Sequence, residues 1–168
     1  MRKHLFEGII RAPLTEPAPS PDGAALTELA NSLDRTARRR LGRSLSIRVV
    51  DAGSCNGCEL ELHALGNAFY DLERFGFHLV ASPRHADVLL VTGPVTTNMR
   101  EALERTYSAI PNPKWVVALG DCALDGGLFA GSYACVGGVA SVIPVDLHIR
   151  GCPPPPEKII EGLLALIA

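Results

Sequence analysis

The chain has 168 residues, of which 47% are hydrophobic and 20% charged, so it is long enough for one sizeable core within a single domain. It has no run of 18 or more apolar residues, and no apolar stretch follows the basic pair Arg2 and Lys3. We therefore expect neither a transmembrane helix nor a secretory signal. Aromatic residues make up only 5% and the net charge is −2, which argues against nucleic-acid binding. Five cysteines without a secretory signal favour metal or catalytic roles over disulfides.

The charges are unevenly distributed and divide the chain into two predicted parts. Residues 1–44 carry eight Lys and Arg against five Asp and Glu, whereas residues 45–168 carry eight against thirteen. Prolines disfavour a helix over residues 1–23, and residues 24–41 combine leucines at helical spacing with a run of arginines. We expect residues 1–43 to be an extension made of a tail and a basic amphipathic helix. Its arginines could face solvent, an acidic subunit or anionic lipid headgroups.

From Ser44 onward, short apolar stretches alternate with helical patterns. Stretches typical of buried strands cover residues 45–50, 77–81, 88–91, 115–119 and 145–149. Helical patterns cover residues 58–75, 98–108 and 157–167. The first predicted helix has four residues spaced to form a buried stripe: Leu62, Leu65, Phe69 and Leu72. Uniformly apolar strands separated by helices predict an α/β domain over residues 44–168, with an open parallel sheet covered by helices on both faces. Residues 121–138 are predicted to form a glycine-rich loop, long enough to be functional.

Four of the five cysteines follow predicted strands. Cys55 and Cys58 form a CxxC pair at the corner between the first strand and the helix after it, and Cys122 and Cys152 each lie three residues after a later strand. Because the carboxyl ends of parallel strands lie along one edge of a sheet, the four thiols are expected to converge there. Four thiolates from one pair and two single cysteines suit a 4Fe-4S cluster, and a Cys-Pro sequence such as Cys152–Pro153 recurs at such sites.

Two other interpretations of these cysteines stay open. A four-cysteine zinc site is disfavoured, because structural zinc sites usually combine two CxxC-like pairs and only one is present. A thioredoxin-like dithiol also has a CxxC pair at a strand-to-helix corner, but it would leave Cys122 and Cys152 without a role. Cys135 lacks the setting at a strand end, and we expect it to be a small, buried, apolar residue.

The segments around the four cysteines resemble those of a known protein family. They are GSCNGCE at 53–59, GDCA at 120–123, GGLF at 126–129 and GCPP at 151–154. Together they resemble the small subunit of energy-converting, membrane-bound nickel-iron hydrogenases of the formate-hydrogenlyase type, which is related to the B-type subunit of complex I. The resemblance covers about residues 44–168.

This resemblance implies a fold, a cofactor and partners. The fold would be flavodoxin-like, holding one 4Fe-4S cluster with Cys55, Cys58, Cys122 and Cys152 as its ligands. The chain would be an electron-transfer subunit of an oxidoreductase complex, not catalytic alone, beside the active site of a hydrogenase-like large subunit. A ferredoxin-like polyferredoxin subunit and the membrane subunits of an ion-pumping complex would be further partners. Through them the chain would lie peripherally on the cytoplasmic side of the cell membrane.

The spacing of the first two cysteines favours one branch of this family. Complex I-type subunits resemble one another in having two adjacent cysteines, whereas two residues separate Cys55 from Cys58, as in the hydrogenase branch. We therefore prefer a hydrogenase-like relay, with a complex I-type subunit that passes electrons to quinone as the alternative. Glu59 and Glu61 follow the pair and are candidates for coupled proton transfer. A solvated or subunit-facing stripe is an equally open interpretation of both.

Overall fold

The computed structural model describes residues 42–167 and eight residues of the segment before them. Those eight are all helical: Ala24, Ala25, Thr27, Glu28, Asn31, Ser32, Arg35 and Arg39. The tail predicted over residues 1–23 lies outside the described residues, and so does most of the predicted basic helix. Within the described part of the chain, no helix is both long enough and apolar enough to cross a membrane.

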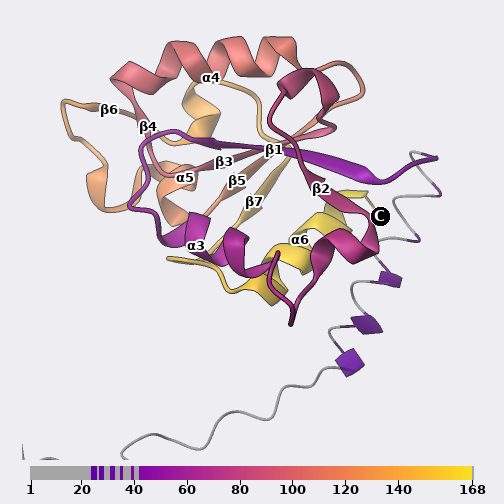
Figure 1. The fold of residues 1–168 in the computed structure, drawn as a ribbon. Coiled ribbons are helices and arrows are strands. Elements are labelled where there is room, and N and C mark those ends of the chain that lie inside the picture. Colours follow the sequence, from indigo (N-terminus) through magenta and orange to yellow (C-terminus); the bar gives the residue numbers. More distant parts are fainter. Residues whose placement is uncertain are drawn as a thin grey trace, which may run out of the picture.

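A five-stranded parallel sheet forms the centre of the domain, in the spatial order β2-β1-β3-β5-β7 (Figure 1). Its strands are β1 (Leu45–Asp51), β2 (Phe77–Leu79), β3 (Val88–Thr92), β5 (Trp115–Leu119) and β7 (Leu147–Ile149). The predicted α/β fold with an open parallel sheet is confirmed. All five predicted strands are present, although β2 and β7 are shorter than expected. The central strand β3 is buried along its whole length, as expected for a strand covered on both faces.

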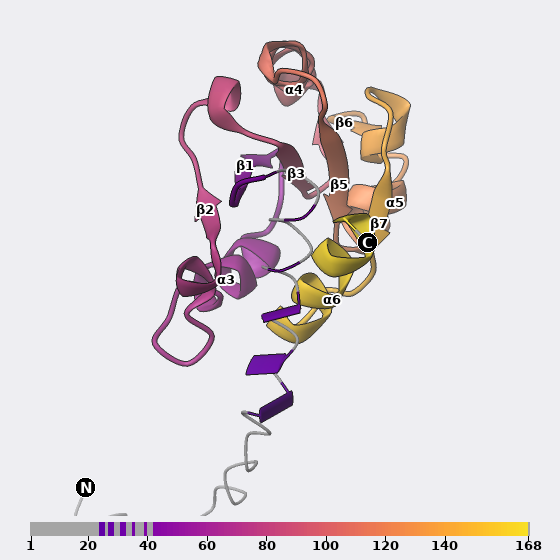
Figure 2. The same ribbon diagram turned by 90° about the vertical axis from the view of Figure 1, so that its right-hand side faces the viewer.

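Helices cover both faces of the sheet, as Figures 1 and 2 show. One face carries α3 (Gly57–Ala64) and α6 (Pro156–Ile167), and the other carries α4 (Thr97–Ala109) and the short α5 (Asp121–Asp125). Leu62 and Ile159 belong to the core on the first face, and Leu103 and Ala123 belong to the core on the second. The described chain also contains four short 3-10 helices: η1 (Leu72–Phe75), η2 (Pro83–His85), η3 (Gly127–Phe129) and η4 (Val139–Ser141).

The helix predicted over residues 58–75 is wrong beyond Ala64, where α3 ends. The side chain of Asn67 accepts hydrogen bonds from the backbone N–H groups of Phe69 (2.8 Å) and Tyr70 (3.0 Å). These bonds give the backbone a local turn in place of helical hydrogen bonds. Phe69 is consequently 51% exposed and is not part of the core. The other three residues of the predicted stripe are buried: Leu62, Leu65 and Leu72.

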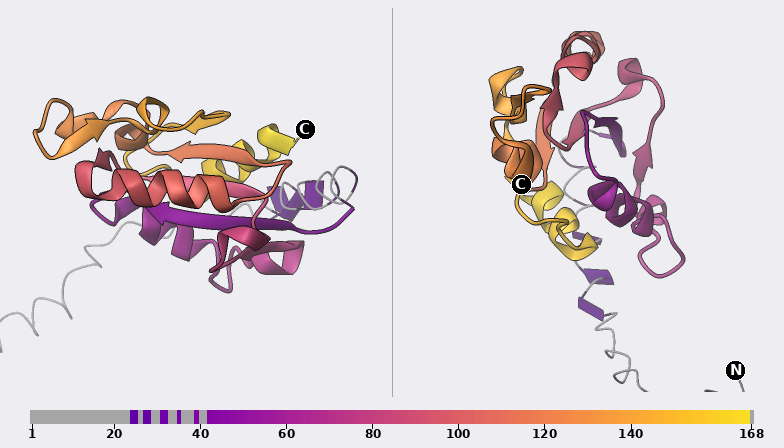
Figure 3. Two further views of the ribbon diagram at one scale, coloured as in Figure 1. Left: turned by 90° about the horizontal axis from the view of Figure 1, so that it is seen from above. Right: turned by 90° about the vertical axis from the view of Figure 1, so that its left-hand side faces the viewer.

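The segment predicted as a loop over residues 121–138 contains regular structure. It includes α5, η3 and a strand, β6 (Cys135–Gly137), which pairs antiparallel with β4 (Val95–Thr96) in a separate two-stranded ribbon. Figure 3 shows this segment on the side of the domain where the parallel strands end. The prediction that Cys135 is buried is also wrong: the residue is half-buried, in a strand that has β4 as its one paired neighbour.

Asp87, which precedes β3, is only 4% exposed and accepts three hydrogen bonds. Their donors are Arg43 Nη1 (3.1 Å), Arg43 Nη2 (2.5 Å) and the backbone N–H of Ser46 (2.9 Å). Removing the carboxylate leaves the Ser46 amide without its acceptor, at a cost of about 1–3 kcal/mol. We therefore expect Asp87→Ala to lower the free energy of unfolding by about this amount, as measured by urea denaturation.

The exposed ion pair between Arg105 and Glu101 supplies the control for this prediction. Such pairs at helical spacing contribute only about 0.5 kcal/mol or less, so Glu101→Ala should change the free energy of unfolding little. Equal losses in the two variants would show that the buried carboxylate has no special role.

Candidate functional site

The four predicted ligand cysteines line one cavity of about 90 Å³. Cys55 and Cys58 enter it from the corner after β1, Cys122 from the start of α5, and Cys152 from the turn after β7, while Gly93 after β3 forms another part of the wall. Each of these segments follows a strand of the parallel sheet. The structure thus brings the four thiols together at the carboxyl edge, as the order of strands and cysteines predicted.

Side-chain hydrogen bonds organise the corner that carries the CxxC pair. Asp51 Oδ1 accepts hydrogen bonds from the backbone N–H groups of Gly53 (2.8 Å) and Ser54 (2.7 Å). Ser54 Oγ in turn accepts one from the N–H of Asn56 (3.0 Å). Asn56 lies between the two cysteines and has a left-handed backbone (φ 72°), which asparagine tolerates better than most residues. These features shape the backbone around Cys55 directly before α3, whose second residue is Cys58.

Glycines lie directly against the thiols of this cavity. A Cβ atom at Gly120 would lie 2.8 Å from Cys58 Sγ, and one at Gly127 would lie 2.8 Å from Cys122 Sγ. Both glycines also have a positive φ, of +89° and +51°. Because an L side chain adopts such a backbone only with strain, glycine meets a conformational and a steric requirement at each position.

The electrostatics of the cavity oppose ionisation of its thiols. Burial, followed by the negative charge of Glu59 and then those of the other three cavity cysteines, raises the pKa of Cys58 to about 12. Burial and the neighbouring Cys152 likewise raise the pKa of Cys122, although a backbone hydrogen bond from Leu128 acts in the opposite direction. Thiols that oppose each other's ionisation become four thiolates together only when a cationic group balances their charge.

The donor set of this cavity fits an iron-sulfur group. Cysteine thiolates are the ligands of 4Fe-4S clusters, and the described residues that line the cavity offer four of them and no imidazole. Across the described part of the chain, no group of three or more His, Cys, Asp or Glu side chains is arranged to hold a metal ion. The four thiols border a common space without forming a coordination shell around one point.

The raised pKa of Cys58 predicts slow alkylation of the full chain before any cofactor is inserted. A shift from 9.0 to about 12 leaves the thiol protonated near neutral pH, and only the thiolate reacts. At about pH 8, iodoacetamide should modify Cys58 at least about 100-fold more slowly than in the urea-unfolded chain, measured by site-resolved mass spectrometry. The rate should keep rising with pH beyond about pH 9, and a plateau near that pH would contradict the prediction.

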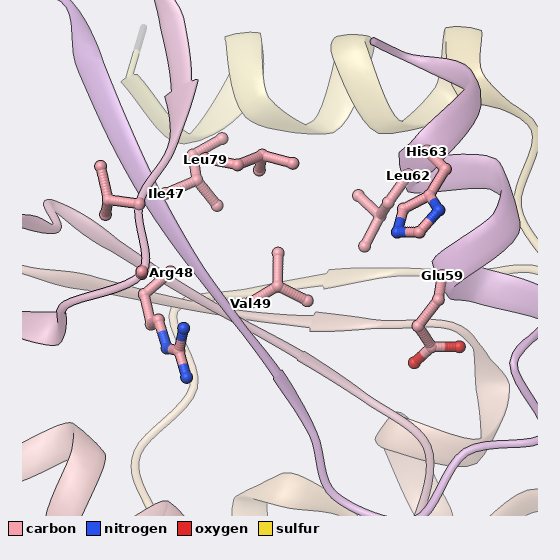
Figure 4. Close-up of a pocket in the computed structure, with 9 residues that line it drawn as sticks. Ile47, Arg48, Val49, Glu59, Leu62, His63 and Leu79 are labelled. Atoms are coloured by element: carbon pink, nitrogen blue, oxygen red, sulfur yellow. The ribbon is translucent and has the colours of Figure 1, made fainter.

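Glu59 and Glu61 lie on α3, and neither lines the cysteine cavity. Glu59 borders a second cavity of about 260 Å³ together with Arg48 from β1 and His63 (Figure 4). Its Oε2 accepts a hydrogen bond from Ser54 Oγ (2.6 Å), whereas its Oε1 is buried without a partner. Glu61 is half-buried. Proton transfer through either residue stays a prediction.

Two polar residues of the cysteine cavity are not predicted from the sequence. Asp121 and Ser54 both line it, and each directly precedes a cysteine, Cys122 or Cys55. The signal in the sequence was that each of them stands next to a predicted ligand. Whether their side chains border the cavity depends on how the turns meet in space, which the sequence pattern does not specify.

Comparison with known proteins identifies the family. Residues 55–166 match the family described as NADH ubiquinone oxidoreductase, 20 Kd subunit. The chain belongs to this family. This family includes subunits of both complex I and hydrogenase-related complexes, as the relatives of the chain show.

Three relatives represent the two branches. The probable membrane-bound hydrogenase subunit of Pyrococcus furiosus is 47% identical over 124 residues, covering 74% of each chain. Formate hydrogenlyase subunit 7 of Escherichia coli is 40% identical over 142 residues, which is 84% of this chain and 56% of that protein. The B-type subunit of NADH-quinone oxidoreductase from Heliobacterium modesticaldum is 46% identical over 112 residues, covering 66% and 64%. The resemblance expected from the motifs is confirmed at the level of the family.

A solved structure is also similar. It is a chain in the membrane-bound sulfane sulfur reductase, an archaeal respiratory membrane complex, with a TM-score of 0.66 and 38% identity. The match covers 81% of this chain and 73% of that one. Family members thus occur in several kinds of redox complex, so the family alone does not specify the reaction.

Proposed function

We propose that this chain holds one 4Fe-4S cluster on Cys55, Cys58, Cys122 and Cys152 and relays single electrons within a hydrogenase-like membrane complex. The observation that carries the proposal is the convergence of four thiols on one cavity at the carboxyl edge of the sheet. A 4Fe-4S cluster bound there would accept and release one electron at a time. The chain would be a subunit of an oxidoreductase and not catalytic alone. In this proposal, residues 44–168 form the cluster domain and residues 1–43 its extension.

The residues around the cavity would hold the redox group in place and determine its exposure and its hydrogen bonds. The half-buried Cys58 and Cys122 lie deeper in the domain, whereas Cys55 and Cys152 are exposed. The side of the cavity with the exposed thiols is open to a partner protein. The backbone N–H of Leu128 donates a hydrogen bond to the Cys122 thiol. This bond favours the thiolate form, because it lowers the pKa of Cys122 against the effect of burial.

Exposed apolar side chains next to the cavity support a large protein partner. Leu128 is 93% exposed and Tyr133 is fully exposed, and both lie in the segment that follows Cys122. Exposed apolar patches are a feature of surfaces that bind other proteins. We assign this face to a hydrogenase-like large subunit. A polyferredoxin subunit and membrane subunits would complete the complex and hold the chain on the cytoplasmic side of the membrane.

A complex I-type subunit that passes electrons to quinone is the second candidate, because a relative named for NADH-quinone oxidoreductase is 46% identical to the chain. The two residues between Cys55 and Cys58 favour the hydrogenase branch. Nickel analysis of the purified complex separates the candidates. Nickel with hydrogen evolution supports the first, and quinone reduction without nickel supports the second.

The cluster itself is tested on the complex purified without oxygen. We expect about four iron and four sulfide ions per copy of this chain beyond those of its partners, and a signal in electron paramagnetic resonance (EPR) after reduction. The contribution of this chain is isolated by comparison with a complex in which Cys58 is replaced by alanine. Equal iron, sulfide and EPR signals in the two complexes would overturn the proposal. Zinc in place of iron would support a structural metal site.

A further inference from the structure

Asp121 places a carboxylate in the wall of the cysteine cavity. The other described residues that line this cavity supply thiols, one hydroxyl, one proline ring and glycine backbone. Asp121 is half-buried and directly precedes Cys122 at the start of α5. A negative side chain beside thiolates is unfavourable, because like charges in a partly buried site repel one another.

Asp121 is held in place by two reciprocal hydrogen bonds with Gly151. Its backbone N–H donates to the carbonyl oxygen of Gly151 (3.0 Å), and Asp121 Oδ1 accepts from the N–H of Gly151 (3.2 Å). Because Gly151 directly precedes Cys152, these bonds join the two turns that carry Cys122 and Cys152. The carboxylate therefore has a fixed position relative to two of the four thiols.

We propose that Asp121 is a positioning residue that joins these two turns and keeps the reduction potential of the bound redox group low. The inference rests on the proposed function. A fixed negative charge beside a group that gains an electron disfavours the reduced form. Charge and hydrogen bonding around the ligand sulfurs are recognised means by which a protein sets such potentials.

The same backbone and side-chain pattern recurs at the opposite end of the sheet and offers a matched control. The N–H of Asp146 donates to the carbonyl oxygen of Val116 (2.9 Å), and Asp146 Oδ2 accepts from the N–H of Val116 (2.7 Å). This pair also joins the β5 and β7 segments, but at their amino ends. Asp146 does not line the cysteine cavity. Neutralising Asp146 alters the same kind of hydrogen bond and removes the same charge, but away from the cysteine cavity.

The experiment measures the midpoint potential of the cluster in the purified complex by redox titration followed with EPR. Asp121→Asn and Asp146→Asn each keep an acceptor oxygen and remove one negative charge. We expect Asp121→Asn to keep the iron content of the unmodified chain and to shift the midpoint potential to a more positive value. Asp146→Asn should change neither quantity. Asp121→Ser is a second neutral variant with an acceptor oxygen, in case the asparagine variant does not assemble.

The outcomes separate this inference from the proposed function. A positive shift in an Asp121 variant, absent in Asp146→Asn, supports the inference. Equal potentials in Asp121→Asn and the unmodified chain overturn it while leaving the cluster assignment intact. If neither Asp121 variant assembles a cluster but Asp146→Asn does, the carboxylate is needed to build the site and the claim about the potential is overturned. Absence of any cluster signal from the unmodified chain refutes the proposed function instead.

Discussion

Replacing Cys152 with serine should lower the iron and acid-labile sulfide held by this chain by at least about tenfold. Cys152 is the thiol that the turn after β7 contributes to the cavity. Losing even an outer-shell partner of a ligand typically costs about 10–100-fold in metal affinity, and loss of a ligand itself should cost no less. Because Cys152 is exposed, the substitution changes little of the core, and the chain should still fold. Iron and sulfide analysis with EPR of the anaerobically purified complex provides the measurement.

Cys135 is the matched control for this experiment. It is the fifth cysteine, lies in β6, is half-buried and does not line the cavity. Cys135→Ser makes the same change of sulfur to oxygen, and it should leave the iron content, the sulfide content and the EPR signal unchanged. Full cluster content in Cys152→Ser would exclude this residue as a ligand. Equal losses in both variants would show that the site responds to general destabilisation and not to a missing thiolate.

The sequence predicted the sheet because short, uniformly apolar runs bounded by turn residues are typical of strands buried on both faces. The run Val88–Val91 and the run Trp115–Leu119 became the neighbouring strands β3 and β5. Once such strands are parallel, their carboxyl ends share an edge, so residues shortly after them are neighbours even when far apart in the chain. The meeting of Cys122 and Cys152 at one cavity follows from this rule.

Features that depend on individual hydrogen bonds could not be predicted in this way. The leucines of the predicted helix are buried, yet α3 ends at Ala64 because Asn67 bonds to the backbone of the following residues. Hydrophobic spacing reports which side chains are buried, not whether the chain between them stays helical. The position of Asp121 depends on a hydrogen bond to Gly151, thirty residues later, which only the packed turns define.

Gly120 is the second position at which a single substitution should remove the cluster. It lies between β5 and α5, and its backbone (φ 89°, ψ 160°) falls in a region that is almost exclusive to glycine. Alanine at this position would cost about 1–3 kcal/mol in backbone strain. Its Cβ would also lie 2.8 Å from Cys58 Sγ, closer than a sulfur atom and a methyl group can approach. The thiol must move away, and a displaced thiol no longer faces the cavity that the other three share.

We therefore expect Gly120→Ala to lose most of the iron and sulfide held by this chain, measured on the complex purified without oxygen. Gly131→Ala separates the two causes, because Gly131 also has a positive φ (80°) but a Cβ there would meet nothing within 4 Å. The control should lower the free energy of unfolding in urea and leave the cluster content unchanged. Full cluster content in Gly120→Ala would mean that Cys58 can move without consequence, which is incompatible with its role as a ligand. Loss of the cluster in both variants would attribute the effect to backbone strain, not to contact with the thiol.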